Sequence, residues 1–440
     1  MTMTAKVKWP TRRLGDLAEF RNGVNYNKSS FGEGVKVVGV SDFQDYTKPR
    51  YGELEQINPE GIVTERNILR DGDIVFVRSN GNRELIGRSL FIEQPPEEIT
   101  HSAFTIRLRF ISHEVHPKFY AYCFRTPLIR HGLAAQGGGT NINNLNQDIL
   151  NALEVPLPPL PIQRRIAGIL SGYDELIENC QRRIQILEAM ARALYREWFV
   201  QFRFPGHEKL PLVASPIGSI PKGWEVSRVP GCVDINPRVS VSRDSEKPFV
   251  PMGCLSNDSM LITDIQSRLG NSGAKFQNGD TLFARITPCL ENGKTGFVQF
   301  LPDAEAVACG STEFIVLRSR TLTPEFVYCL ARSEDFRGVA IKSMSGATGR
   351  QRVQGQCFDD FKIAHPPRAL LDRFAAIVAP SFQLIYKLHL QIQNLRQTRD
   401  LLLPRLLSGD FELAGSCAKN STSATAKAKT KEMVNHGQNR

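Results

Sequence analysis

The sequence predicts a mixed α/β protein made of two tandem copies of one domain, joined by two long helices that pair antiparallel as a coiled coil. Three observations predict it: an internal repeat with a spacing near 207 residues, a proline segment that closes each copy, and a stripe of apolar residues after each proline segment. A chain of 440 residues is long enough for two or three domains, at roughly 150 residues each.

The repeat is clearest where "DGDIVFVR" at 71–78 answers "NGDTLFAR" at 278–285. Gly72, Asp73, Phe76 and Arg78 are each repeated 207 positions later. Further matches follow in the same order: Gly87 and Phe91 with Gly293 and Phe297, Leu108 and Arg109 with Leu317 and Arg318, Phe119 and Arg125 with Phe326 and Arg332, and Thr140 with Thr348. Near the start, "WPTRRLGDL" weakly echoes "WEVSRVPGC". Two copies of one domain are the simplest interpretation.

Each copy ends in prolines that lead directly into a helical pattern. "LPPLPIQRRIAGIL" at 157–170 is answered by "HPPRALLDRFAAIV" at 365–378. Pro158, Pro159 and Ala167 are each repeated 208 positions later, and Ile166 corresponds to Phe374. Consecutive prolines hold an extended backbone and prevent a helix from continuing into the preceding domain. The helices are therefore predicted to begin after the prolines.

An apolar stripe follows each proline segment. Alternate steps of four and three from Ile166 meet no charged residue at ten positions, ending at Trp198. The same steps from Phe374 give eight apolar residues of ten, with Ser381 and Arg399 as the exceptions. For one helix alone, packing on its own domain would be the simpler interpretation. Two matching stripes over more than four heptads favour pairing of the helices.

The pair is predicted to be antiparallel because each helix starts at the end of its own copy. Ile166 to Trp198 spans about 48 Å at roughly 1.5 Å per residue. A centred pair places Arg399 opposite Tyr173, which suggests a cation–π contact as a hypothesis. Pro380, one turn inside the second helix, predicts a local kink.

These signals predict six segments. They are a first domain at 1–158, a first spacer helix at 159–200, a linker at 201–225, a second domain at 226–366, a second spacer helix at 367–408 and a basic disordered tail at 409–440. The linker is rich in proline and glycine. The tail consists mostly of small, polar and basic residues and has too few apolar side chains to form a core.

Composition favours a polyanionic partner in a reducing compartment. The net charge is +10 and the pI is near 9.2, and the nine cysteines form no CxxC pair. The N-terminus lacks an apolar signal core, and no run of about 18 apolar residues occurs. We expect a cytoplasmic protein with no membrane contact.

Catalytic and cofactor motifs are incomplete. "GKT" at 293–295 lacks the upstream glycine of a phosphate-binding loop, and "HEVH" at 113–116 has the wrong spacing for two zinc ligands on one helix. "INPR" at 235–238 lacks the second proline and the aromatic residue of an amino-methyltransferase tetrapeptide. No cofactor and no metal are therefore expected in this chain, and no catalytic residue is assigned.

Polar, glycine-bearing loops occupy equivalent places in the two copies and differ in sequence. They offer the arginine, lysine, asparagine and glutamine donors that read base edges and phosphates, although solvated turns are the simpler interpretation of any single residue. The candidate DNA-binding residues are Arg78, Asn80, Asn82, Arg83, Arg88, Thr140, Asn141, Asn143, Asn144, Arg285, Lys294, Thr348, Arg350 and Arg352.

Four strings together resemble the specificity subunits of Type I restriction-modification systems: "PLPPLPIQRRIAGIL", "YREWFVQFRFPG", "IGSIPKGWE" and "LLLPRLLSGDFEL". The resemblance covers about residues 9 to 413. It implies two target recognition domains, at 1–158 and 226–366, which bind an asymmetric bipartite sequence in double-stranded DNA. It also implies two modification subunits that methylate adenine with S-adenosylmethionine, and restriction subunits that cut DNA with ATP and magnesium.

On this resemblance the chain is a non-catalytic subunit that directs its partners. The alternatives are a fused restriction or methyltransferase enzyme, and a coiled-coil scaffold that reads no sequence. The chain departs from the family pattern at the second hinge, where Leu371 and Asp372 replace Gln163 and Arg164. This difference predicts unequal contacts with the partner subunits.

Overall fold

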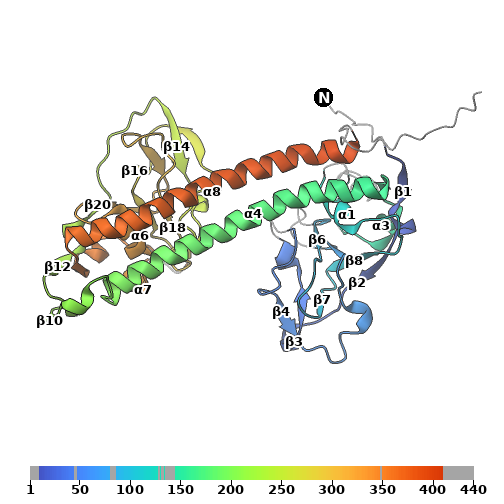
Figure 1. Cartoon of the computed structure of the whole chain (residues 1–440), viewed down its shortest axis with the longest axis horizontal. Helices are drawn as coiled ribbons and strands as arrows, with labels where there is room; N and C mark the ends of the chain where they lie inside the picture. Colours follow the sequence, from blue (N-terminus) through green and yellow to red (C-terminus); the bar gives the residue numbers. More distant parts are fainter. Residues whose placement is uncertain are drawn as a thin grey trace, which may run out of the picture. The chain divides into compact units, whose positions relative to one another are not determined.

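The computed structural model describes residues 9–43, 47–79, 86–126, 129, 133, 144–346 and 349–409. The chain forms two compact units, one of Met1–Ala167 with Leu402–Arg440 and one of Gly168–Leu401. Figure 1 shows the elements of both units, which we describe separately. The predicted tail lies outside the described residues, except for Gly409.

The described part of the first unit contains three sheets. A four-stranded sheet has the order β2 (Ala18–Asn22), β8 (Thr105–Phe110), β5 (Ile74–Val77) and β6 (Ser89–Phe91). A three-stranded sheet has the order β4 (Glu55–Ile57), β3 (Phe31–Val38) and β7 (Ile99–His101). The strands β1 (Thr11–Arg13) and β9 (Glu154–Pro156) form a pair, and the short helices are α1 (Pro117–Cys123) and α3 (Gln147–Ala152).

The second unit repeats this plan. Its four-stranded sheets have the orders β13 (Val233–Ile235), β20 (Phe314–Ser319), β17 (Thr281–Ala284), β18 (Thr295–Phe297), and β15 (Gln266–Leu269), β14 (Glu246–Val250), β19 (Ala308–Gly310), β16 (Ala274–Phe276). The strands β12 (Glu225–Arg228) and β21 (Lys362–His365) form a pair. The short helices are α5 (Val229–Cys232), α6 (Pro324–Arg332) and α7 (Glu334–Lys342).

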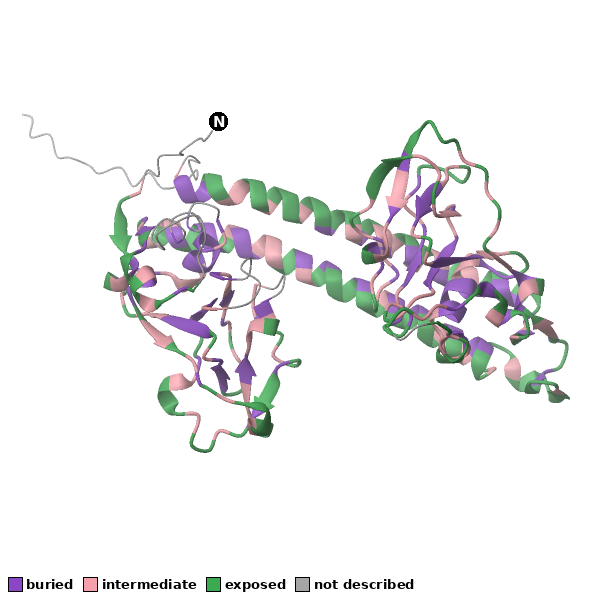
Figure 2. Ribbon diagram, turned by 180° about the vertical axis from the view of Figure 1, so that it is seen from behind, coloured by how far each residue is buried: buried purple, intermediate pink, exposed green. Residues whose placement is uncertain are grey.

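The two units confirm the predicted repeat in their topology. The first strand of each copy pairs antiparallel with the last, β1 with β9 and β12 with β21. Each copy also has one parallel pair, β3 with β7 and β14 with β19. Every residue of β5 and of β17 is buried, and Figure 2 shows buried residues gathered on the strands of each domain. The matched apolar strings are therefore the equivalent cores of two similar domains.

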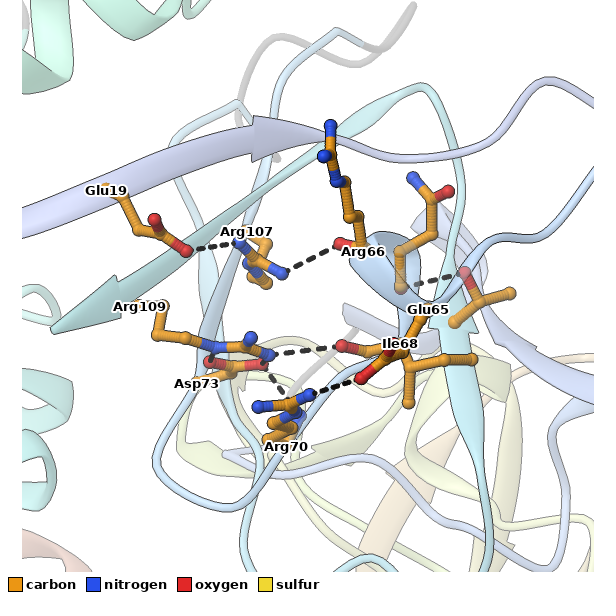
Figure 3. Close-up of polar contacts among 10 residues, drawn as sticks. Glu19, Glu65, Arg66, Ile68, Arg70, Asp73, Arg107 and Arg109 are labelled. Carbon is orange, nitrogen blue, oxygen red and sulfur yellow. Dashed lines mark hydrogen bonds and ion pairs between the residues drawn. The ribbon is translucent and has the colours of Figure 1, made fainter. Parts of the chain in front are cut away.

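The repeated aspartate and arginine form the same ion pair in each copy. Arg109 donates two hydrogen bonds of 2.7 Å to the buried Asp73, as Figure 3 shows, and Arg318 donates two of 2.7 Å to Asp280. Each carboxylate also accepts a backbone N–H from the residue three positions before it. The pair ties the turn before β5 or β17 to the neighbouring strand, so these repeated charges support the framework.

Two long helices, α4 (Leu160–Tyr195) and α8 (Arg368–Ser408), carry the predicted apolar stripes. In the second unit they lie side by side (Figure 1). Trp198, in the π-helical turn after α4, lies 6.1 Å from the ring of Phe374, and Arg399 is paired with Asp174. Each contact joins a residue near the start of one helix to a residue near the end of the other, which confirms the antiparallel pairing.

The stripe residues line the helix interface as the periodicity predicts, except that Arg399 has a different partner from the one proposed. Ile177 and Ile184 on α4 and Ile385 and Ile392 on α8 share one core. Arg399 lies at the predicted place, but its guanidinium is held by the carboxylate of Asp174, which neighbours Tyr173 in the chain. A carboxylate binds a half-buried guanidinium more strongly than an aromatic ring does, so the pair replaces the proposed cation–π contact.

The second helix is continuous across Pro380, whose ring lies on the exposed side. It ends at Gly409, whose φ of +79° is favourable for glycine and whose added Cβ would lie 2.8 Å from the Trp9 ring. The helix α8 is long and apolar enough, by length and composition alone, to cross a membrane. Phe374, Val378 and Ile385 of this helix are buried in a protein core, whereas Ile377 and Leu390 are exposed.

The segment at 201–225 is more ordered than its composition predicts. It contains the hairpin of β10 (Leu212–Ser215) and β11 (Gly218–Pro221). Trp224 is buried and stacks on Phe204, with ring centroids 5.4 Å apart. These aromatic side chains attach the connection to the core of the second domain.

The hinge residue Gln163 is fully buried, so it offers no surface to a partner. Its amide donates to the carbonyls of Glu114 and Pro158, at 2.9 and 2.8 Å, and accepts the backbone N–H of His116 at 2.8 Å. Leu371 is equally buried in the second copy. The predicted difference in partner contacts is therefore wrong for this position, while Arg164 and Asp372 are exposed.

Replacing Gln163 with leucine is expected to lower the free energy of unfolding by about 2–4 kcal/mol, because one backbone N–H and two carbonyls lose their buried partner. Leu371→Gln, the matched exchange, should also destabilise, since it buries an amide in an apolar site. Urea unfolding of the full chain measures both, with Arg164→Ala as an exposed control. Wild-type stability for Gln163→Leu would contradict the assigned role.

Candidate nucleic-acid interface

The structure brings two predicted loops of the second domain together. The N–H of Val353 donates to the carbonyl of Arg285 at 2.9 Å, and the N–H of Thr287 donates to the carbonyl of Gln351 at 3.1 Å. The loop that follows β17 therefore runs beside the loop that precedes β21. Side chains from segments more than 60 positions apart thus share one surface.

The first domain has the same backbone arrangement at Arg78. The N–H of Leu145 donates to the Arg78 carbonyl at 2.9 Å, as that of Val353 does to Arg285. The N–H of Arg78 donates to the Phe104 carbonyl at 2.8 Å, as that of Arg285 does to Glu313 at 3.0 Å. Arg78 and Arg285 therefore occupy equivalent places.

Two of the predicted arginines in the second domain meet at one carboxylate. Arg352 donates through Nε to both carboxylate oxygens of Glu313, at 2.9 and 3.0 Å, and its Nη2 forms an ion pair with Glu313 at 2.8 Å. Arg285 donates to Glu313 through Nε at 3.3 Å. The hydrogen bond from Arg352, followed by that from Arg285, lowers the pKa of the Glu313 carboxyl against the effect of desolvation. Glu313 is therefore charged at neutral pH, and it orders two basic side chains.

A groove of about 790 Å³ lies beside this cluster, with Arg238, Lys275 and Arg285 in its lining. Asn236 and Pro237 separate it from a second hollow of about 690 Å³ that reaches Gln354. The sequence alone does not predict Arg238 or Lys275 as DNA-binding residues. Arg238 belongs to the "INPR" string, which resembles a catalytic motif only in part. The three basic side chains stand among apolar lining residues such as Phe314 and Val316, so the groove offers positive charge to phosphates and apolar surface to bases.

The other predicted residues are more scattered. Arg350 and Asn144 are exposed, and Arg88 is half-buried. Lys294 is half-buried and donates to the carbonyl of Met252 at 3.3 Å. Seven candidates lie outside the described residues: Asn80, Asn82, Arg83, Thr140, Asn141, Asn143 and Thr348.

A buried histidine underlies the interface of the first domain. Thr105 donates its hydroxyl to the Ser102 carbonyl at 2.7 Å and lies 2.9 Å from Nδ1 of His101, so we assign the proton of His101 to Nδ1. Burial, followed by the positive charges of Arg107 and Arg109, lowers the pKa of His101 from 6.5 to about 3. The folded domain therefore holds this ring neutral.

We expect the stability of the first domain to fall in mild acid. Because the pKa is lower in the folded state, the contribution of His101 is complete above pH 6.5 and is lost as the pH falls towards 3, at about 1.4 kcal/mol per pH unit. Unfolding measured between pH 7.5 and 4.5 should show a steeper loss in the wild type than in His101→Asn. His113→Asn, an exposed exchange, is the control. Equal slopes for wild type and His101→Asn would refute the assignment.

Within the described ranges, no group of three histidine, cysteine, aspartate or glutamate side chains is placed to hold a metal ion. The described surface features are a groove with three basic side chains in the second domain, and loops that differ in sequence between two similar frameworks.

The sequence of residues 6–189 matches the family described as Type I restriction modification DNA specificity domain. Over these residues the chain carries a Type I DNA specificity domain. Its similarity continues beyond the matched residues: it is 27% identical over 310 residues to the MjaIX specificity subunit of Methanocaldococcus jannaschii, covering 67% of this chain and 69% of the relative.

A second relative and one solved structure are also similar to the chain. The chain is 35% identical over 264 residues to the MjaVIII specificity subunit of the same organism, covering 56% of this chain and 60% of the relative. The crystal structure of the S subunit from M. genitalium has a TM-score of 0.52 at 14% identity, over 92% of this chain and 98% of that chain. At that identity the likeness supports the fold.

Proposed function

We propose that this chain is a specificity subunit that reads a bipartite sequence in double-stranded DNA, one half-site with each domain. The observation that carries the proposal is the equivalence of Arg78 and Arg285, which share a backbone arrangement but are flanked by loops of different sequence. A shared framework with different loops is suited to reading two different half-sites.

Two kinds of contact would contribute to recognition: contacts with phosphates and contacts with base edges. Arg238, Lys275 and Arg350 attract phosphates, which fixes the register of the duplex on the domain. Loop side chains such as Arg352 and Asn144 contact base edges, where guanine and adenine present acceptors to arginine and asparagine.

We propose that the chemistry belongs to the partners. Two modification subunits would methylate adenine with S-adenosylmethionine, and restriction subunits would cut DNA with ATP and magnesium, in the cytoplasm. The specificity subunit itself would hold no cofactor. Incubating the purified chain with DNA and S-adenosylmethionine tests this division, because methylation by the chain alone would support a fused methyltransferase instead.

Replacing Arg350 with alanine is expected to weaken DNA binding by the assembled complex and to reduce the salt slope by about 1, as loss of one phosphate contact does. Arg78→Ala should weaken binding through the first domain. The control is Lys222→Ala, which removes one positive charge from an exposed turn. Titration of a fluorescent duplex at several salt concentrations measures both quantities. Unchanged affinity and slope for both arginine variants would remove them from the interface.

A further inference from the structure

One position has the same backbone in both domains and a different side chain. Phe104 lies immediately before β8 and Glu313 immediately before β20. Each N–H donates to the hydroxyl of a serine two positions earlier, at 3.2 Å in both copies. Each carbonyl accepts the N–H of the equivalent arginine, Arg78 or Arg285. The framework therefore presents this side chain at the same place in each reading surface.

In the second domain the side chain is a carboxylate that holds two guanidiniums. Glu313 is 20% exposed, and its partners Arg285 and Arg352 are 23% and 41% exposed. The two arginines come from different loops and would repel each other without the carboxylate between them. Arg285 also donates through Nη1 to Gln354 at 3.3 Å. The cluster keeps a net positive charge, and part of Arg352 remains in solvent.

In the first domain the side chain is a phenyl ring that is 60% exposed. A large exposed aromatic side chain is unusual in a tight turn between two buried strands, and here it lies beside Arg78. It offers an apolar edge and face, which suit the methyl group of thymine or the face of a base. It cannot fix a guanidinium as a carboxylate does.

We propose that the position of Phe104 and Glu313 determines the base preference of each domain. This inference rests on the proposed function. Glu313 acts as a positioning residue, orienting Arg352 so that its planar donors read guanine in the second half-site. Phe104 makes an apolar contact with a thymine methyl group in the first half-site. An arginine held before binding loses less conformational freedom on contact with the base, which favours the correct base over others.

The test uses the complex with its modification subunits and a duplex library randomised in one half-site at a time. Glu313→Gln keeps the size of the side chain but removes its charge. It is expected to lower the preference for guanine at one base pair of the second half-site about tenfold and to leave the first half-site unchanged. Phe104→Ala should lower the preference for thymine in the first half-site only. Glu305→Gln, an exposed exchange in the same domain, is the control.

Melting temperatures of the variants distinguish a loss of folding from a loss of base preference. If Glu313→Gln does not fold, Arg352→Lys decides the question, since it keeps the charge and loses the planar fork, and it should lower the same guanine preference. Half-site preferences that survive Glu313→Gln, or Arg352→Lys where that variant is needed, would overturn the inference and leave the proposed function intact. A wild-type complex with no sequence preference in the library would overturn the proposed function itself.

Discussion

Replacing Asp73 with alanine is expected to destabilise the first domain by about 3 kcal/mol, because Arg109 loses its carboxylate in a mostly buried site. The value lies at the lower end of the range for buried pairs, since the Arg109 side chain is 22% exposed. The backbone N–H of Arg70 also loses its acceptor. Asp280→Ala should have an effect of the same size in the second domain, where Arg318 is 27% exposed.

Chemical denaturation of the full chain, followed by hydrogen exchange of each domain, measures the two effects separately. Glu65→Ala is the matched control, because Glu65 is 87% exposed and pairs with Arg70 at the surface (Figure 3). It should change the stability very little. Equal losses for Glu65→Ala and Asp73→Ala would show that the repeated pair has no special structural role.

Exchanging residues 1–155 for the corresponding domain of another specificity subunit is expected to change one half of the recognised sequence and to keep the other. The physical reason is that the reading loops of the first domain are attached to its own framework, through the hydrogen bond from Leu145 to Arg78. Sequencing the methylated adenines in cells that carry the chimaera and its modification subunits measures both halves.

The reciprocal exchange of residues 226–361 is the control, and it should change the other half. A recognition sequence that is unchanged by either exchange would refute the assignment of one half-site to each domain. A change in both halves from a single exchange would show that the two domains read DNA jointly.

The framework of each domain could be predicted because the same sequence pattern occurs in both copies of the internal repeat. Gly72 and Asp73 recur before the same buried strand as Gly279 and Asp280, and both glycines have a positive φ, of +86° and +89°. The antiparallel helices could be predicted as well, since burial of a stripe depends on spacing more than on the identity of each side chain. The position of Arg399 followed from the same spacing.

Partners of individual polar groups could not be predicted in this way. The sequence placed Arg285 and Arg352 in separate loops, and only the folded chain shows that Glu313 holds both. Arg238 and Lys275 could not be predicted because they belong to no repeated string, and they line one groove although they lie far apart in the sequence. Gln163 is polar and two arginines follow it in the sequence, but its amide is buried against backbone groups of Glu114 and Pro158.

The pairing of first and last strands has a consequence for how such chains can change. Thr11 lies opposite Pro156, and Glu225 lies opposite His365, so the chain enters and leaves each domain at adjacent points. A genetic crossover at these two points replaces everything between them while the hydrogen-bonded ends still meet. The helix that follows then starts from an unaltered position. New recognition loops can thus be acquired by recombination as whole inserts, without accompanying mutations in the coiled coil.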